Sequence, residues 1–327
     1  MDLVIVWGKF LLLLILVLIF GNRAARSADI IAEKKGLAKA FMGVVFISMV
    51  TSFPELFTGI SAGAIVKAPD IAVGQILGSC VFNLFIIGVI EVFYRKKKLY
   101  QNTGKANIVP LGFSLAIIAA VTLFLSIGAK MGWQIFHVGV TSIIVFAMYI
   151  LFMRVIFKDR KAEGESEDKY KDKNLKRELW SFVTSALVII AVGIYLPIVG
   201  EELARLMHWS NSFVGVIFLA LVTSFPEFVV SFSTARMGAF DMLLGNIIGS
   251  NLFNIAIIFI IDLSYLKGNV LTAASQDHVT VGLIAVLMNF VVFFAVIRHS
   301  SYRLFNFISI NGILLIGLYV VNLLVLL

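Results

Sequence analysis

The chain has 327 residues, of which 60% are hydrophobic and only 14% charged, and its mean hydropathy is +1.01. This composition excludes a soluble globular protein and indicates an integral membrane protein. The formal net charge of +8 is not a nucleic-acid signal, because most of the basic residues fall in three loops, where they report membrane orientation.

Long continuous apolar runs predict helices and not the strands of a barrel, because hydrocarbon offers no partners to an open backbone. We predict an all-α polytopic membrane protein with ten transmembrane helices. The expected spans cover approximately residues 3–21, 37–66, 71–93, 107–128, 133–157, 179–200, 210–236, 241–265, 279–298 and 303–326.

One long polar segment divides these spans into two groups of five. Residues 158–178 read KDRKAEGESEDKYKDKNLKRE, which is too poor in apolar residues to pack into a core. The predicted organisation is therefore a first five-helix repeat at 1–157, a charged cytoplasmic linker at 158–178 and a second five-helix repeat at 179–327.

Basic residues follow the first, third and fifth predicted spans. Arg23, Arg26, Lys34 and Lys35 follow the first, the run 95–98 follows the third, and the linker follows the fifth. The positive-inside rule then places both termini outside. Because each half has an odd number of spans, the second half crosses the membrane in the opposite direction to the first.

The two halves carry the same motif. Residues 43–55 read GVVFISMVTSFPE and residues 215–227 read GVIFLALVTSFPE, at an offset of 172 residues from Glu55 to Glu227. A second block, PDIAVGQILGSCVFN at 69–83, recurs as FDMLLGNIIGSNLFN at 240–254, at an offset of 171 from Asp70 to Asp241. Such an internal duplication in inverted topology is typical of secondary transporters that bind their substrate near the midplane.

Each motif places a carboxylate, Glu55 or Glu227, inside an apolar span. An ionised side chain at the bilayer centre costs about 2.5–3.5 kcal/mol on insertion scales, so these residues are expected to serve a function. Pro54 and Pro226 should break their helices near Val50 and Val222, leaving the carbonyls of residues 48–50 and 220–222 without amide partners.

The other polar residues of the motifs are oxygen donors on shared helix faces. Spacings of four place each threonine of the first block beside its glutamate, and each serine of the second block beside an asparagine. These donors are Thr51, Thr223, Ser79, Asn83, Ser250 and Asn254. Carboxylate, hydroxyl, amide and carbonyl oxygens suit hard cations such as calcium and sodium, and the single cysteine, Cys80, excludes a multi-cysteine metal site.

Several further residues have structural interpretations. Asp70 and Asp241 are expected to cap the helices that they begin, and Glu91 and Asp262 are expected at the membrane interface. The glycines Gly74, Gly78, Gly245 and Gly249 should allow close helix packing. The four histidines, His137, His208, His278 and His299, are expected at the membrane interface. The first copy of the second block has Cys80 where the second copy has Asn251, and this difference is expected to have no consequence.

The TSFPE motif followed by a GSxxFN block, in two inverted copies, resembles the alpha-repeats of the cation/calcium exchanger superfamily, most closely its sodium/calcium exchanger branch. The resemblance covers residues 43–90 and 215–262. It implies a calcium site formed by Glu55, Glu227, Thr51 and Thr223. It further implies that Ser79, Ser250 and the carbonyls of Ser48 and Ala220 assist with sodium.

Two departures from relatives narrow this interpretation. Certain prokaryotic members and the potassium-dependent exchangers have an aspartate at the position of Asn254. Proton/calcium exchangers typically have a histidine after the motif glutamate, where this chain has Leu56 and Phe228. The short linker also has no room for the large calcium-sensing domains of animal exchangers. The pattern is therefore similar to that of prokaryotic sodium/calcium exchangers.

We expect a secondary antiporter, not an enzyme, which exchanges sodium for calcium by alternating access, with the first and sixth spans as a moving gate. It is expected in the cell membrane, with calcium and sodium as substrates and without a cofactor, nucleic acid or obligate protein partner. A proton-coupled exchanger of calcium or another divalent cation on the same scaffold remains the alternative. A passive cation channel and an intramembrane enzyme that uses the two carboxylates also stay open.

Overall fold

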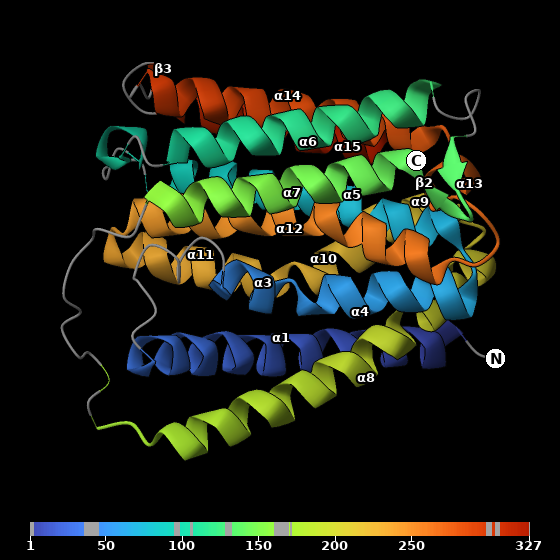
Figure 1. Cartoon of the computed structure of the whole chain (residues 1–327), viewed down its shortest axis with the longest axis horizontal. Coiled ribbons are helices and arrows are strands. Elements are labelled where there is room, and N and C mark those ends of the chain that lie inside the picture. The colour runs from blue at the N-terminus through green and yellow to red at the C-terminus, as the bar shows by residue number, and fades with distance from the viewer. Residues whose placement is uncertain are drawn as a thin grey trace.

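The computed structural model describes residues 3–35, 46–94, 99–104, 107–127, 133–159, 170, 172–298, 303–304 and 308–326. The start of the span expected at 37–66, the basic run 95–98 and most of the linker lie outside these residues. Figure 1 shows the long helices lying side by side in one bundle, with both chain termini toward the same end.

In the first half the helices follow the expected order, with one span divided. They are α1 (Leu3–Lys34), α3 (Ile47–Thr51), α4 (Phe53–Ser61), the π-helical η2 (Ala62–Val66), α5 (Pro69–Phe93), the 3-10 helix η4 (Leu99–Asn102), α6 (Ile108–Ile127) and α7 (Val140–Asp159). A two-residue antiparallel hairpin, β1 (Gln134–Ile135) with β2 (Val138–Gly139), precedes α7.

The second half repeats this order. Its helices are α8 (Leu175–Met207), α9 (Asn211–Phe213), the π-helical η7 (Val214–Leu219), α10 (Ala220–Thr223), α11 (Phe225–Met237), α12 (Phe240–Ser264), α13 (Val270–Ala273), α14 (Asp277–Ile297) and α15 (Ile310–Leu326). A second antiparallel hairpin, β3 (Arg303–Leu304) with β4 (Ile308–Ser309), precedes α15.

Among the described residues, six helices are long and apolar enough to cross a membrane, which makes the protein an integral membrane protein. A seventh candidate is the broken pair Asn211–Thr223 and Phe225–Met237, bent by 48°. The apolar helices Phe53–Val66, Val140–Ile156 and Ile310–Leu326 are shorter. Ten complete spans remain a prediction.

Four expected boundaries are wrong for local reasons. Helix α1 continues to Lys34, and α8 begins at Leu175 inside the expected linker, where the Asn174 side chain caps the amides of Lys176 and Arg177. The spans expected from 133 and from 303 begin as helices only at Val140 and Ile310, because a hairpin occupies the first residues of each.

Helices α5 and α12 form the centre of the bundle. Within their most apolar windows 78% and 83% of residues are buried, against 17% for α1, so α1 faces the surroundings while α5 and α12 are core helices. Helix α5 packs against α14 and α15 of the second half, and α12 packs against α6 and α7 of the first half. The two sequence repeats therefore share one core, while α1 and α8 lie together along one side of it (Figure 1).

Glycine permits the closest approach between the repeats. A Cβ atom at Gly78 of α5 would lie 2.3 Å from the carbonyl oxygen of Val216 in η7, and one at Gly74 would lie 3.3 Å from the Val216 amide nitrogen. The packing role expected for these two glycines is confirmed.

We predict that Gly78→Ala destabilises the protein by about 1–3 kcal/mol, because a backbone atom of η7 cannot yield to the added methyl group. The thermal unfolding midpoint in detergent should fall. Gly317→Ala is the matched control, since no atom lies within 4 Å of the corresponding Cβ position. An unchanged midpoint for Gly78→Ala would contradict the close contact.

Candidate ion-binding site

Both motif helices break at the serine of TSFPE. Ser52 ends α3 and begins α4 with φ −88° and ψ 14°, and Ser224 separates α10 from α11 with φ −85° and ψ 7°. The breaks lie two residues after the positions expected at Val50 and Val222. Proline is tolerated in the first turn of a helix, so a new helix begins immediately before each one.

The carbonyls of Ser48 and Ala220 keep their amide partners, which corrects the expectation. They accept hydrogen bonds from the Ser52 and Ser224 amides at 3.1 and 3.0 Å. A proline lacks the amide that would bond to the carbonyl four residues earlier. Ser48 and Ala220 lie six residues before Pro54 and Pro226, so their carbonyls are not affected. Each carbonyl also accepts a hydroxyl, from Thr51 at 3.1 Å and from Thr223 at 3.4 Å.

The two glutamates are fully buried and bonded to opposite copies of the motif. Ser52 Oγ donates to Glu227 Oε1 at 2.8 Å, and Ser224 Oγ donates to Glu55 Oε1 at 2.9 Å. These two bonds are equivalents under the offset of 172 residues. They bring both carboxylates to the same interface between the repeats.

The second oxygen of each glutamate, Oε2, is buried without a hydrogen-bond partner. Neither Glu55 nor Glu227 forms an ion pair with a lysine, arginine or histidine of the described residues. A buried carboxylate oxygen without a partner is costly. The pair therefore requires a positive charge, either a proton or a metal cation, to be stable in this position.

Hydroxyl groups complete two equivalent clusters beside the glutamates. Thr51 Oγ1 lies 3.4 Å from Ser250 Oγ, and Ser79 Oγ lies 3.4 Å from Thr223 Oγ1. The Ser250 hydroxyl also donates to the Ser48 carbonyl at 3.4 Å. All four hydroxyl side chains are fully buried.

The asparagines of the second block lie on the facing sides of α5 and α12. Asn83 Nδ2 donates to Asn251 Oδ1 at 3.0 Å, and Asn251 Nδ2 donates to the Cys80 carbonyl at 3.3 Å. Neither side-chain atom of Asn254 has a partner, although the residue is fully buried. Asn251 is therefore part of the contact between the halves.

The structure brings together the expected hydroxyls Thr51, Thr223, Ser79 and Ser250, whereas no hydrogen bond joins Asn254 to them, and it adds further polar residues that the sequence analysis did not assign to the site. These are Ser52, Ser224, Asn251 and Gln75, whose Nε2 donates to the Glu55 backbone carbonyl at 2.9 Å. The serines could have been found, because a polar residue repeated at the same position of an apolar span has the same signature as the threonines.

The acidic residues near the ends of α5 and α12 bond to the opposite half of the protein. Asp70 and Asp241 lie in the first turns of α5 and α12, where a carboxylate meets the positive end of the helix dipole, and the Oδ1 of each accepts hydrogen bonds from the opposite half. Glu91 and Asp262 are buried and also bond across, Glu91 to the Ser309 hydroxyl and Asp262 to the Gly139 amide.

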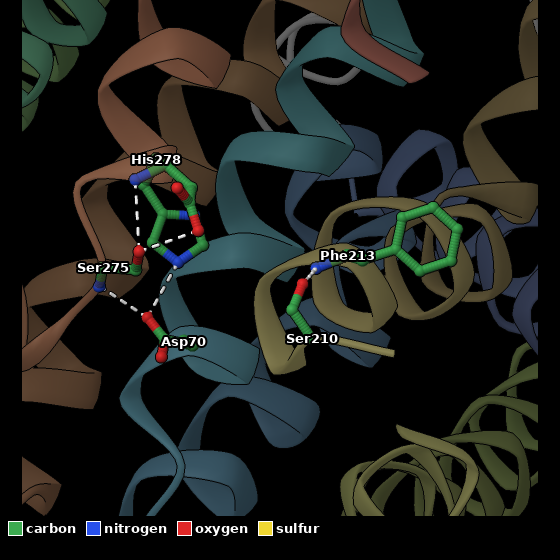
Figure 2. A network of polar contacts seen from close by, with 6 residues as sticks. Asp70, Ser210, Phe213, Ser275 and His278 are labelled. Carbon is green, nitrogen blue, oxygen red and sulfur yellow. Dashed lines mark hydrogen bonds and ion pairs between the residues drawn. The ribbon is translucent and has the colours of Figure 1, made fainter. Parts of the chain in front are cut away.

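His278, expected at the interface, is fully buried. Figure 2 shows it beside Asp70 and Ser275.

Two carboxylates with a charge of about −2 when ionised, surrounded by hydroxyl, amide and carbonyl oxygens, suit one hard divalent cation. Among the described residues no cluster of three or more histidine, cysteine, aspartate or glutamate side chains could hold a metal ion. The fold and these residues together define an integral membrane protein with two buried carboxylates and a set of buried hydroxyls between its two sequence repeats.

Comparison with known proteins identifies the family. The family described as sodium/calcium exchanger protein matches residues 5–157 and 177–327, and the chain belongs to this family within the cation/calcium exchanger superfamily. It is similar to the sodium/calcium exchanger MaX1 of Methanosarcina acetivorans, with 24% identity over 76% of this chain and 80% of that protein. It is also similar to the inner membrane protein YrbG of Escherichia coli, with 24% identity over 84% of each chain.

The fold is that of a solved exchanger. The sodium-calcium exchanger NCX_Mj, soaked with 10 mM Na+ and zero Ca2+, aligns over 98% of both chains with a TM-score of 0.65 and 20% identity. At this identity the likeness establishes the architecture, and the role of each residue has to be argued from this chain.

We predict that Ser52→Ala and Ser224→Ala each weaken calcium binding by about tenfold or more, because each removes a hydrogen bond to a buried carboxylate. Calorimetric titration of the purified protein in detergent measures this. Ser126→Ala is the control, since that hydroxyl is exposed and bonds within its own helix. Unchanged affinity in both site variants would mean that the reciprocal bonds do not organise the site.

Proposed function

We propose that the protein is a secondary antiporter that exchanges sodium for calcium by alternating access at the site between Glu55 and Glu227. The observation that carries the proposal is the reciprocal bonding of each glutamate to the serine of the other repeat, with one oxygen of each carboxylate left without a partner. This leaves two fixed negative charges and a set of hydroxyls for a dehydrated cation.

Thr51, Thr223, Ser79 and Ser250 are proposed to complete the coordination, with the carbonyls of Ser48 and Ala220 and the amides of Asn83 and Asn254 near them. The Thr51 and Ser250 hydroxyls lie near the Glu227 carboxylate, and the Thr223 hydroxyl lies near Glu55. Calcium would bind between the glutamates, and sodium ions would use the flanking hydroxyl clusters together with the same two carboxylates.

Competition for the same carboxylates would couple the two ions. If calcium and sodium each need Glu55 and Glu227, they cannot occupy the site fully at the same time. An empty site would keep two buried charges uncompensated, so the empty protein would resist switching between its two sides. Each change of side would then carry one type of ion.

Helices α1 and α8 are the proposed gate. A Cβ atom at Gly21 of α1 would lie 2.5 Å from Pro226 Cγ, and one at Gly193 of α8 would lie 2.5 Å from Phe57 Cβ. Gly21 and Gly193 are equivalent under the offset of 172 residues. Each gate helix therefore rests on the motif helix of the other repeat, where a sliding movement would open or close a path to the glutamates.

The proposed membrane arrangement retains ten spans, both termini outside and the linker in the cytoplasm. The two termini lie toward the same end of the bundle, as an even number of spans requires (Figure 1). The relative in Escherichia coli is called an inner membrane protein, and we propose the cell membrane for this chain.

Proton coupling is the alternative, and the unpartnered Oε2 atoms are what favour it, because a buried carboxylate can bind a proton as well as a metal ion. On this alternative a pH gradient would drive calcium, and sodium would have no effect.

We expect proteoliposomes loaded with sodium and diluted into sodium-free buffer at equal pH to take up calcium-45. Glu55→Gln and Glu227→Gln should each reduce this uptake by roughly 30-fold or more, because each removes one of two charges that the ion neutralises. Choline-loaded vesicles give the background.

Vesicles with a pH gradient and no sodium test the alternative. Uptake driven by the pH gradient alone would replace sodium coupling with proton coupling. Calcium uptake that follows only its own gradient would indicate a channel, and uptake by Glu55→Gln at the full rate would refute the site.

The contact between Gly21 of α1 and Pro226 offers a test of the proposed gate. Gly21→Val should slow exchange roughly 5-fold or more, because the added side chain would press against Pro226 during the movement. Gly8→Val on the same helix is the control, since no atom lies within 4 Å of that Cβ position. Equal exchange rates in the two variants would argue against a gate at this contact.

A further inference from the structure

Asp70, at the start of α5, is bonded to the segment that leads into α14. Its Oδ1 accepts the Ser275 amide at 2.6 Å and lies 3.2 Å from His278 Nε2. Figure 2 shows both contacts converging on the one carboxylate oxygen. His278 is fully buried, and the Asp70 side chain is 29% exposed.

Asp241, at the start of α12, makes the same contacts in the other direction. Its Oδ1 accepts the Gly104 amide at 2.8 Å and the Asn107 side-chain amide at 3.0 Å, and these two residues lead into α6. Asn107 is buried.

The offset of 171 residues that relates Asp70 to Asp241 also relates Gly104 to Ser275 and Asn107 to His278. One structural device is thus present twice. We call the two sets the inter-half clasps: Asp70 with Ser275 and His278, and Asp241 with Gly104 and Asn107.

Each clasp ties a core helix of one repeat to an outer helix of the other. The first joins α5 to the start of α14, and the second joins α12 to the start of α6. No ion needs to bind to Asp70 or Asp241 for this role, because the bonded oxygen of each already faces two donors.

The first clasp is connected to the ion site by packing along α5. A Cβ atom at Gly74 would lie 3.1 Å from His278 Cε1, and Gly78, one turn further, is held against the Val216 backbone. Ser79 is the next residue, and its hydroxyl faces Thr223. The position of α5 relative to α14 and η7 therefore sets the place of Ser79 in the site.

We propose that Asp70 and Asp241 are positioning residues for ion exchange, which hold α5 and α12 so that the Ser79 and Ser250 hydroxyls reach the ion site. This inference rests on the proposed sodium/calcium exchange. It assigns the two aspartates a role in ion affinity, although neither contacts the ion.

The two inter-half clasps differ in one side chain, histidine in the first and asparagine in the second, and this difference suggests a variant that should preserve the first clasp. His278 and Asn107 occupy equivalent places and both reach the carboxylate through a nitrogen. His278→Asn should therefore rebuild the first clasp with the side chain that the second clasp already uses, whereas His278→Ala removes the contact.

The experiment measures sodium-driven calcium-45 uptake at one fixed pH, with the internal sodium concentration varied. Asp70→Ala and His278→Ala should raise the half-saturating sodium concentration by roughly 2- to 30-fold, the range typical of coupling through packed elements. The maximal rate should change less. His278→Asn should stay within about twofold of the unmodified protein. Asp241→Ala and Asn107→Ala should reproduce the effect through Ser250.

Asn289→Ala controls for general destabilisation. It removes a buried hydrogen bond of 2.7 Å from α14 to Ser114 of α6 and should lower the melting temperature without changing the half-saturating sodium concentration. If the alanine variants at the first clasp do not fold, Asp70→Asn is the substitute, because it keeps the shape of the side chain and removes its charge. It should raise the half-saturating sodium concentration by a smaller factor than Asp70→Ala.

The proposal is overturned if His278→Asn is as impaired as His278→Ala, if Asp70→Asn and His278→Ala both exchange like the unmodified protein, or if Asn289→Ala shifts the sodium dependence equally. These outcomes leave the exchange function itself intact. Absence of sodium-driven uptake by the unmodified protein would instead overturn the proposed function and the clasp's role in it.

Discussion

The reciprocal bonds between Ser52 and Glu227 and between Ser224 and Glu55 are the interaction on which the rest of the structure depends. They place two fully buried carboxylates, one from each repeat, at one interface between the repeats. Neither repeat could build this site alone, because each supplies the hydroxyl that orients the other's glutamate. The helix breaks at Ser52 and Ser224 also help to form this site, since an unbroken helix would orient the serine and glutamate side chains differently.

The contacts between the repeats form layers along the bundle. Polar bonds join the halves in the middle through the site residues and at the ends of α5 and α12 through Asp70, Asp241, Glu91 and Asp262. Between these layers glycine allows backbone contact, as at Gly78 against Val216. Apolar packing alone is a weak source of specificity inside a membrane, because lipid tails are as apolar as the side chains. Buried polar bonds at both ends and in the middle fix the register of the two halves.

The sequence is sufficient for the helical membrane class, the duplication and the family, because these depend on residue type and spacing. Contacts between distant segments could not be predicted, since no spacing rule places Ser275 beside Asp70 or Ser52 beside Glu227. The sequence therefore predicts the place of Asp70 and Asp241 at the start of their helices but not their bonds to the opposite half. The sequence predicts breaks near Val50 and Val222, because the carbonyls of these residues lose a hydrogen bond to proline. The chain breaks instead at Ser52 and Ser224, just before helices that carry a proline in their first turn.

If the two repeats form one shared cation site, equilibrium calcium binding to the purified protein should show a single site that needs both glutamates. Calcium-45 dialysis of the unmodified chain and of Glu55→Gln alone, repeated with increasing sodium, would count the sites. We expect one calcium per chain, displaced by sodium, and loss of all specific binding in the single variant. Two calcium ions per chain, with half of the binding retained by Glu55→Gln, would show that each repeat binds calcium independently and that the site is not shared.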